Sequence, residues 1–448
     1  MRKIQFILRF LYLLCGMVAV IGIDVAELPG QELLTVDDVI QITIQNNYGL
    51  QIARDNLKIA SNNFHAGNAG FLPNLDLSLT YNQSQSNSEQ GYADPTRPVL
   101  KRSDAGSITK AAAANLTWTI FDGFKMFASY NRFNGLKKIE QYKLKKEMET
   151  TISDVLQAYY DVVQQKLIME VDQEAVSISE QRLQIVQQGY DLGVSSNLEV
   201  LQAKVDLNSD RSAYLTQEAI VSDAQSKLLK IMARPPERTS FTVIDTIIVE
   251  PLLAVDSLQQ NLFTRNTDLL IAQQDVDVAR FELREIRSEI YPKLNLSSGY
   301  SYNRSESQAG FIKTNNTYGY LYGAQLYLNL FNGFNTRREL QNYKLNQQNK
   351  QYAFTEMKTN LGHDFDNLAL KYRNSISRLH LEQDNVNVAS ENVKIALEIY
   401  RLGTITALQL REVQRNYVAA KSRFISTAYE VKQYEISIRQ LSGELVRE

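Results

Sequence analysis

The sequence predicts a mainly α-helical protein with a smaller β portion, built from two copies of a single unit. Two repeated patterns indicate the duplication. A helical pattern ending in proline recurs 219 residues further on, and a Phe-x-Gly-Phe motif recurs 210 residues further on. The matched residues are Asn47, Ala53, Ala60 and Pro73 with Asn266, Ala272, Ala279 and Pro292, then Phe121–Phe124 with Phe331–Phe334. The difference between the two offsets places a loop of variable length inside each repeat.

Long helices are expected wherever proline is absent, over residues 99–234 and 293–448. Apolar residues at alternating spacings of three and four predict a coiled-coil seam, which we interpret as helix packing rather than a cofactor site. The seam residues are Val176, Ser179, Leu183, Val186 and Tyr190, with Val386, Ala389, Val393, Ala396 and Tyr400 in the second repeat. The expected helices are 36–70, 125–190, 197–234, 255–288, 335–400 and 407–445. At 1.5 Å per residue, two short helices end to end match one long helix of about 100 Å.

Strand-like alternation of apolar and polar residues begins after each repeat proline and returns before each Phe-x-Gly-Phe motif. These patterns predict four strands in two hairpins, with tyrosines and the sole tryptophan near the apolar band. Such strands are typical of membrane barrels, although a soluble sandwich with one buried face is the alternative. The residues expected to face lipid are Leu75, Leu77, Leu79, Trp118, Ile120, Leu294, Leu296, Leu326 and Leu328. Residues 89–107 should form the longer extracellular loop and 306–316 the shorter one.

The N-terminus reads as an export signal over residues 1–22, with basic residues before a short apolar run. Cys15, the only cysteine, lies in this segment without a lipobox before it. The first repeat is then 23–235, a linker 236–251 and the second repeat 252–448. No later stretch has 18 apolar residues, so any bilayer crossing would use strands. Because four strands cannot close a barrel, strands that span a membrane would require oligomerisation.

Charge and motifs exclude several classes of function. The formal net charge of −2 leaves no polycationic face for nucleic acid. His65, His363 and His380 are isolated, and the sequence lacks the motifs of zinc peptidases, P-loop proteins and serine hydrolases. We therefore expect no enzyme activity, no cofactor and no metal site. A secreted coiled-coil structural protein or adhesin is the alternative function, although it does not account for the hairpins.

An ordered set of short motifs resembles the TolC-like family of outer-membrane efflux channels. The motifs are Leu34–Val39, Asn46-Asn47, Phe71-Leu72-Pro73, Phe121-Asp122-Gly123, Leu192-Gly193, Leu402-Gly403 and Leu441-Ser442-Gly443, and the match covers about residues 31–446. The resemblance implies a homotrimer in the outer membrane, with a twelve-stranded barrel continued by an α-helical tunnel in the periplasm. It also implies two partners, a periplasmic adaptor (membrane fusion) protein and an inner-membrane pump. The function would be a passive exit duct for drug efflux or for type I protein secretion, and the residues do not choose between them.

The same resemblance assigns roles to the two helix turns. Adaptor docking falls on Gly193, Val194 and Ser195 and on Gly403, Thr404 and Ile405, where we expect Val194 and Ile405 to be exposed. The family pattern places two acidic residues six and nine positions after the turn glycine, at the narrowest point of the tunnel. Those positions hold Gln409 and Glu412, and in the first repeat Glu199 and Gln202, so one acid per repeat remains. Tyr190 and Tyr400, at the ends of the seams, are expected to brace the closed periplasmic aperture.

Overall fold

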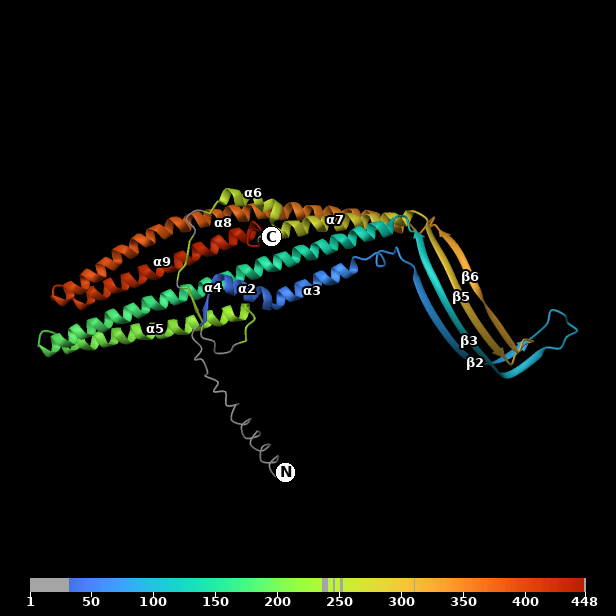
Figure 1. Cartoon of the computed structure of the whole chain (residues 1–448), viewed down its shortest axis with the longest axis horizontal. Coiled ribbons are helices and arrows are strands. Elements are labelled where there is room, and N and C mark those ends of the chain that lie inside the picture. Colours follow the sequence, from blue (N-terminus) through green and yellow to red (C-terminus); the bar gives the residue numbers. More distant parts are fainter. Residues whose placement is uncertain (1–31, 236–240, 245, 250–252, 310, 447–448) are drawn as a thin grey trace, which may run out of the picture. The chain divides into compact units, whose positions relative to one another are not determined.

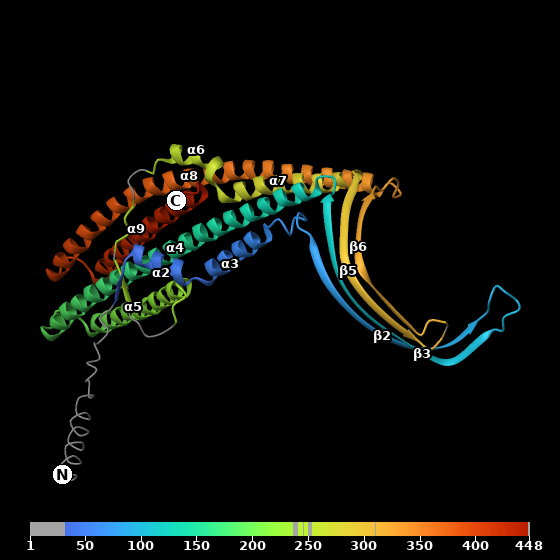
Figure 2. The same cartoon turned by 45° about the vertical axis from the view of Figure 1, so that its right-hand side comes forward.

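The computed structural model describes residues 32–235, 241–244, 246–249, 253–309 and 311–446. The expected signal peptide and Cys15 lie outside these residues, as does much of the expected linker. The chain forms two compact units, and each contains segments of both repeats. Unit 1 comprises residues up to 46, 154–249 and 378–432, and unit 2 comprises 47–153, 250–377 and 433–448. Figures 1 and 2 show the elements.

The helix boundaries confirm the duplication. The helices of the first repeat are α2 (Val36–Asn46), α3 (Tyr48–Asn63), α4 (Lys125–Asp191) and α5 (Asn197–Ile231). Those of the second are α6 (Val255–Arg265), α7 (Thr267–Arg287), α8 (Asn335–Arg401) and α9 (Ala407–Leu441), with a 3₁₀ turn at Ser288–Ile290. Helices α6 and α7 begin 219 residues after α2 and α3, and α8 and α9 begin 210 residues after α4 and α5. None of the described helices is long and apolar enough to cross a membrane.

One expected helix, 36–70, is wrong as a single element, because the chain breaks at Asn47. Asn47 has an extended backbone (φ −60°, ψ 124°), and its side-chain oxygen accepts a hydrogen bond from Leu50 N. Asn266 breaks the second repeat in the same way and accepts from Leu269 N at 2.9 Å. An asparagine oxygen satisfies a backbone N–H at a helix start, so each asparagine begins a new helix. Helix α3 also ends earlier than expected, at Asn63.

Four antiparallel strands form one sheet in unit 2, as the sequence predicts (Figure 1). They are β2 (Asn74–Gln90), β3 (Leu100–Phe121), β5 (Lys293–Ser307) and β6 (Thr314–Tyr327), in the order β2-β3-β5-β6. The expected loop 89–107 is too wide, because the hairpin continues until Gln90 pairs with Leu100. The second loop, expected at 306–316, is likewise shorter, since Glu306 pairs with Thr314. Leu328 lies beyond the end of β6, whose last residue pairs with the first residue of β5.

The Phe-x-Gly-Phe motif turns the chain from strand β3 into helix α4. Gly123 and Phe124 both have positive φ (71° and 70°). A Cβ at Gly123 would lie 2.5 Å from the carbonyl oxygen of Ser288, so only glycine fits against this backbone. The Asp122 side chain then accepts a hydrogen bond from Met126 N at 2.9 Å and caps the start of α4.

Unit 1 contains a small parallel sheet in which β1 (Glu32–Leu34) pairs with β4 (Phe241–Val243). Buried Tyr159 on α4 joins the two strands, because its hydroxyl donates to Leu34 O and accepts from Ile244 N, both at 3.2 Å. In the same unit α4 lies beside α5, and α8 lies beside α9 (Figures 1 and 2).

A buried carboxyl group, Glu149 on α4, lies in unit 2 beside the start of α7. Its side chain is 2% exposed, and Thr267 Oγ1 donates to its Oε2 at 2.9 Å. Its Oε1 has no hydrogen-bond partner among the described residues. Burial raises the pKa of Glu149, against the lowering effects of the Thr267 hydrogen bond and of Lys145. The folded protein therefore binds the proton of Glu149 more tightly than the unfolded chain does.

Glu149→Gln should raise the melting temperature at pH 8 and leave it nearly unchanged at pH 4. A pKa above the unfolded value means that the folded state binds more protons, so wild-type stability falls as pH rises from the ordinary glutamate range through the folded pKa. Glutamine keeps the acceptor for Thr267 and does not ionise. Thermal unfolding of both proteins across this pH range measures the difference. Exposed Glu391→Gln is the control, and an equal shift in both variants would contradict a specific role for burial.

Candidate functional site

The sheet presents one apolar and one polar face. Register places Leu77 opposite Ala114 and Leu79 opposite Ala112. Because residues directly opposite each other share a face, the side chains of these rows project together. The same face continues through Trp118 opposite Leu296 and Leu294 opposite Leu326. The structure therefore brings the expected apolar positions within the strands onto one side. Ile120 differs, since it lies at a bulge between Thr119 and Phe121.

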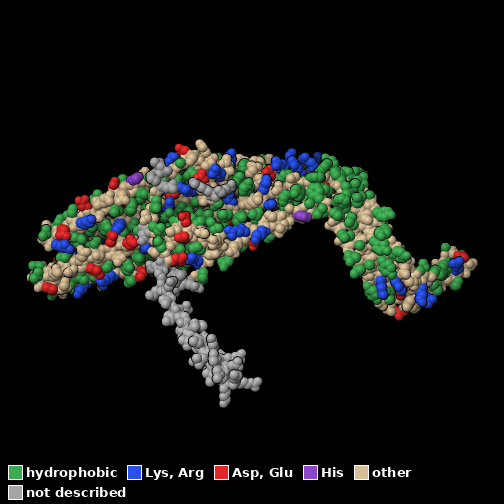
Figure 3. Space-filling view, in the orientation of Figure 1, with side chains coloured by type: hydrophobic (Ala, Val, Ile, Leu, Met, Phe, Trp, Pro, Cys, Tyr) green, Lys and Arg blue, Asp and Glu red, His purple; other side chains and the backbone are tan. Residues whose placement is uncertain are grey.

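The apolar face is exposed on the single chain, with Leu75, Leu77 and Leu79 between 71% and 75% exposed. Figure 3 shows hydrophobic side chains gathered over the strands. Tyrosines extend this face, and the rings of Tyr300 and Tyr320 lie 5.0 Å apart. Lys110 and Arg304 follow on the same row, opposite each other. This row of aromatic and then basic side chains is the order expected at a membrane interface.

The opposite face carries Asn, Asp, Ser and Thr side chains, among them Asp76, Ser78, Ser297 and Ser301. Leu321 is one exception on this face, where it lies opposite Gly299 and is 67% exposed.

Each of the two helix turns is built by a glycine followed by a capping residue. Gly193 and Gly403 have positive φ (79° and 74°), which ends helices α4 and α8. Ser196 and Glu199 then form a capping box at the start of α5. Thr406 and Gln409 make the same exchange at α9, where Gln409 Oε1 accepts from Thr406 N at 2.9 Å. A Ser or Thr cap therefore stands immediately before the second helix at both turns.

The expected exposure of the turns is correct for Val194, which is 81% exposed, and wrong for Ile405, which is half-buried. Ile405 corresponds to Ser195 in the first repeat, whose hydroxyl lies so close to Gly189 that a Cβ there would meet it at 2.4 Å. In the first repeat this position thus folds back onto the last turn of the long helix. The exposed apolar residues that the sequence reasoning missed are Leu192, Leu198, Leu402 and Leu408, each 75–81% exposed.

Two of the expected aperture residues have local partners in these capping boxes. Glu199 accepts from Ser196 N at 2.8 Å, and Gln409 accepts from Thr406 N. Glu412 lies one helical turn further along α9 and is exposed. The structure thus gives Glu199 and Gln409 a helix-capping task that the family pattern alone does not predict.

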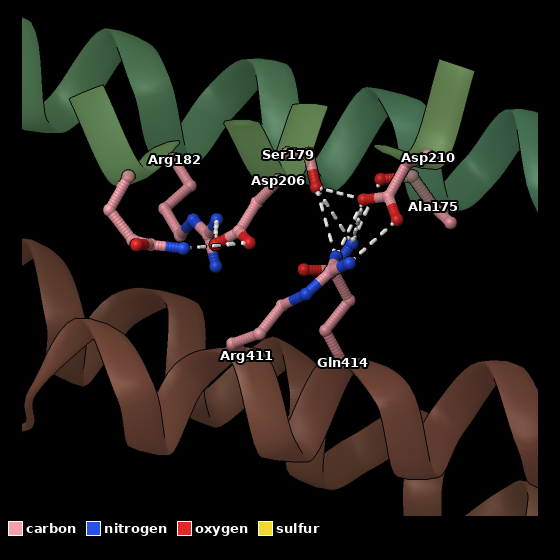
Figure 4. A network of polar contacts seen from close by, with 8 residues as sticks. Ala175, Ser179, Arg182, Asp206, Asp210, Arg411 and Gln414 are labelled. Atoms are coloured by element: carbon pink, nitrogen blue, oxygen red, sulfur yellow. Dashed lines mark hydrogen bonds and ion pairs between the residues drawn. The ribbon is translucent and has the colours of Figure 1, made fainter. Parts of the chain in front are cut away.

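A buried polar network joins α4 and α5 to α9 within unit 1 (Figure 4). Arg411 makes two hydrogen bonds to the Asp210 carboxylate, at 2.6 and 2.8 Å. Gln414 Nε2 donates to Ala175 O at 2.9 Å and to Ser179 Oγ at 3.0 Å, and Ser179 donates to Asp210. Ser179 and Gln414 are at most 1% exposed. The bidentate Arg411–Asp210 pair attaches the second repeat to the first near the turns.

Arg182 forms a second part of this network through an ion pair with Asp206. Its side chain is 1% exposed, and two of its guanidinium nitrogens have no partner among the described residues. Gln202 Nε2 also donates to Asp206, at 3.2 Å. Burial raises the pKa of Tyr400, while the Arg182 charge lowers it and the Glu199 charge raises it. Of the expected aperture residues, Gln202 and Tyr400 therefore lie near the Arg182–Asp206 pair and Glu199 lies near Tyr400, whereas Tyr190 is 45% exposed.

Arg182 also corrects the predicted seam of α4. Ser179 and Val186 are buried as expected, but Arg182 occupies the buried position between them and Leu183 is only half-buried. Tyr190 is likewise outside the buried stripe. In α8, Val393 and Ala396 are buried as expected. The ion pair with Asp206 is what permits a charged residue in the seam.

The network residues Arg182, Asp206, Asp210, Arg411 and Gln414 were missed from the sequence. A charge on a heptad helix usually faces solvent, so no pattern marked Arg182 as buried. One signal was available in the sequence. Arg182 on α4 carries a charge opposite to that of Asp206 and Asp210, which lie one turn apart on the neighbouring helix α5.

Comparison with known proteins identifies the family to which this architecture belongs. The family model "Outer membrane efflux protein" matches residues 39–234 and 258–444. The probable outer membrane lipoprotein SilC of Salmonella typhimurium is 20% identical over 90% of this chain and 84% of that protein. The outer membrane protein TolC of Salmonella enteritidis is 22% identical over 84% of this chain and 74% of that protein.

The structure of the outer membrane protein VceC of Vibrio cholerae matches with a TM-score of 0.72 at 16% identity, over 91% of this chain and 96% of that one. The likeness of fold thus extends through the strands and the helices. With two family matches that cover both repeats, the chain belongs to the outer membrane efflux protein family and is an outer-membrane efflux channel.

Proposed function

We propose that three copies of this chain assemble into one channel, with twelve strands closed into a barrel in the outer membrane. The observation that carries the proposal is the four-stranded sheet with an exposed apolar face and a polar opposite face. Within the described residues each outer strand, β2 and β6, pairs on one side only. In lipid, an open edge would leave backbone groups unpaired at several kcal/mol each, and assembly removes both edges.

The channel would act as a passive exit duct of a tripartite efflux or secretion system. Its helical part would lie in the periplasm, an adaptor would dock at the exposed turns, and an inner-membrane pump would supply the energy. We assign it no enzyme activity. The exposed leucines at the turns, Leu192 and Leu402, support the docking role, since large exposed apolar side chains grouped on a surface are typical of binding sites.

The channel proposal is tested by extraction and by conductance. Membranes should release the protein only with detergent, as an oligomer, and the purified oligomer should produce discrete conductance steps in planar bilayers. Release by salt or alkali alone, without conductance, would favour the alternative, a secreted coiled-coil structural or adhesin protein.

Replacement of the turn glycines should abolish transport while leaving assembly intact. Gly193→Asp and Gly403→Asp place a charged side chain at a positive-φ position on the proposed docking surface. Both sites have open space around an added Cβ, so the effect should be local. Substrate export by cells measures transport, and detergent-extracted oligomer measures assembly. Gly70→Asp is the matched control, because Gly70 also has positive φ (93°) and open space around an added Cβ but lies away from both turns in the sequence. Normal export in both turn variants would reject the docking role.

Neutralising Glu412 should reduce cation selectivity. One Glu412 per copy gives a ring of three carboxylates, which concentrates cations in a narrow pore. Glu412→Gln should therefore shift the reversal potential toward zero in a salt gradient across a planar bilayer. Tyr400→Phe should raise the fraction of open channels, because the half-buried Tyr400 side chain near Arg182 would lose its hydroxyl. Glu398→Gln, on the exposed side of α8, is the matched control. Unchanged selectivity in Glu412→Gln would place the constriction elsewhere.

A further inference from the structure

The two repeats already meet inside one chain, and this contact supplies a template for the contact between copies. Strand β3 of the first repeat pairs with β5 of the second, with Thr117 opposite Ser297. The strands at the open edges are their counterparts, since β6 corresponds to β3 and β2 corresponds to β5. We propose that β6 of one copy pairs with β2 of the next copy in the register that β3 and β5 have within the chain. This inference rests on the proposed oligomeric channel.

The two repeat offsets, 210 for β3 and β6 and 219 for β2 and β5, give the β6–β2 pairs between copies from the β3–β5 pairs within the chain. Thr117 corresponds to Tyr327 and Ser297 corresponds to Ser78, so Tyr327 would lie opposite Ser78 of the neighbouring copy. The same shift places Leu326 opposite Leu79, Leu328 opposite Leu77, and Gln325 opposite Thr80. Among these pairs, leucine meets leucine on one face, and Gln325 and Tyr327 meet hydroxyl-bearing residues on the other. A slip of one residue would place each leucine on the polar face.

This register also provides a partner for Leu328 and the residues after it. Within the chain β6 ends at Tyr327, because β5 begins at Lys293 and offers no further residue. The apolar alternation nevertheless continues through Leu330, which is 88% exposed. In the proposed register, the neighbouring β2 extends along these residues and completes the strand that the sequence pattern predicts. The strand would then stop where β3 stops, at the Phe-x-Gly-Phe motif.

A side-chain hydrogen bond in the template has a chemically matched counterpart. Within the chain, Thr119 Oγ1 donates to Asn295 Oδ1 at 2.9 Å. The corresponding pair between copies is Asn329 and Asp76. The Asn329 amide is a donor and the Asp76 carboxylate an acceptor, so the bond is kept with the same direction and gains a charge. Both side chains are exposed in the single chain.

The helices give a second reason, independent of the strands, to expect the contact between copies to resemble the contact within the chain. Helix α7 lies against α4, where Thr267 bonds to Glu149 and an added Cβ at Gly135 would lie 2.9 Å from Val278. The counterpart of Val278 is Ile59 on α3, and the counterpart of Gly135 is Leu345 on α8, so the contact between copies must be wider at this point than the contact between α7 and α4. Val278 is buried at 7% exposure, whereas Ile59 and Leu345 are 57% and 58% exposed. Both exposed residues would be covered if α3 of one copy lies against α8 of the next.

Disulfide formation tests the register directly. Leu328→Cys combined with Leu77→Cys should give intermolecular disulfides on copper-phenanthroline oxidation of intact membranes. Directly opposite residues have Cβ atoms about 4.5–5.5 Å apart, whereas diagonal residues are about 7–8 Å apart, too far for a disulfide. The slipped pairs Leu328→Cys with Leu75→Cys and with Leu79→Cys should therefore cross-link at least about tenfold less.

A control pair inside the chain has the same strand geometry as the test pair. It helps to distinguish a wrong register from the absence of an oligomer. Leu116→Cys with Ser298→Cys, directly opposite within the sheet, should form an intramolecular disulfide and no larger species. Single variants, whose only other cysteine is Cys15 in the expected export signal, should give no cross-link. Oligomers that cross-link most at a slipped pair, or at none, would overturn the register and leave the channel proposal standing. Loss of the oligomer from the wild-type protein would instead remove the proposed function.

Discussion

Leu77→Arg should destabilise the folded protein in a bilayer by about 2–4 kcal/mol, the cost of a basic side chain at the midplane of a lipid-facing strand. Leu77 lies in the middle of the apolar row from Leu75 to Tyr81 and is 73% exposed on the single chain. Its partner on β3 is Ala114, which offers no opposite charge. The guanidinium would therefore have to reach past the row toward the headgroups. Guanidinium-induced unfolding in lipid vesicles measures the loss.

The neighbouring residue is the control for this change. Ser78→Arg introduces the same side chain on the same strand but on the polar face, and should be mild. Leu296→Arg and Ser297→Arg repeat the comparison on β5, where Ser297 pairs with Thr117. Equal loss of stability at Leu77 and Ser78 would contradict the assignment of the two faces to lipid and water.

Asp206→Ala should cost about 3–5 kcal/mol, because it leaves the Arg182 charge buried without its partner. Arg182 is 1% exposed, and Asp206 is its ion-pair partner across the α4–α5 hairpin. Gln202, which donates to Asp206, would also lose its acceptor. Replacing both members of the pair, with Arg182→Met and Asp206→Leu, should restore most of the stability, since apolar side chains of similar size fill the site. Chemical unfolding of the detergent-solubilised protein measures all three variants.

The matched control lies on the same two helices. Glu180 and Arg211 form an ion pair across the α4–α5 hairpin with an N–O distance of 2.7 Å, but their side chains are 50% and 55% exposed. Glu180→Ala should cost about 0–1 kcal/mol, since water and salt screen an exposed pair. If Asp206→Ala costs no more than Glu180→Ala, the Arg182 site is hydrated and the network does not hold the hairpin.

Local signals in the sequence were sufficient to predict most of the fold. A proline-free heptad pattern predicts the long helix 125–190, and α4 spans Lys125–Asp191. The strand starts at Asn74 and Lys293 follow from alternation after proline. The break at Asn47 was missed because asparagine is compatible with a helix interior, and only its extended backbone makes it a cap. The strand pairs near Glu89 were missed because charge and proline suggested a loop.

The site was less predictable, since it depends on which side chains meet across helices. The turns and their caps could be predicted from Gly193, Gly403 and the residues after them. The burial of Arg182 could not, because its neighbour Leu183 fits the apolar period better. Likewise the half burial of Ile405 could not be predicted, because an apolar residue beside a glycine turn suggests exposure.

The polar network has no charged copy in the other repeat. The counterparts of Ser179, Asp206 and Asp210 are Ala389, Asn416 and Ala420, and the residue that corresponds to Arg411 is Leu201. If each repeat were a separate chain and identical chains formed a ring, every contact between neighbouring repeats would carry the same residues. Such a ring could not have a charged network at one contact and uncharged residues at the next. Fusion of two repeats into one gene lets a mutation reach alternate contacts only. The duplicated chain can therefore keep a charged, specific contact within each copy, while any contact between copies is free to diverge separately.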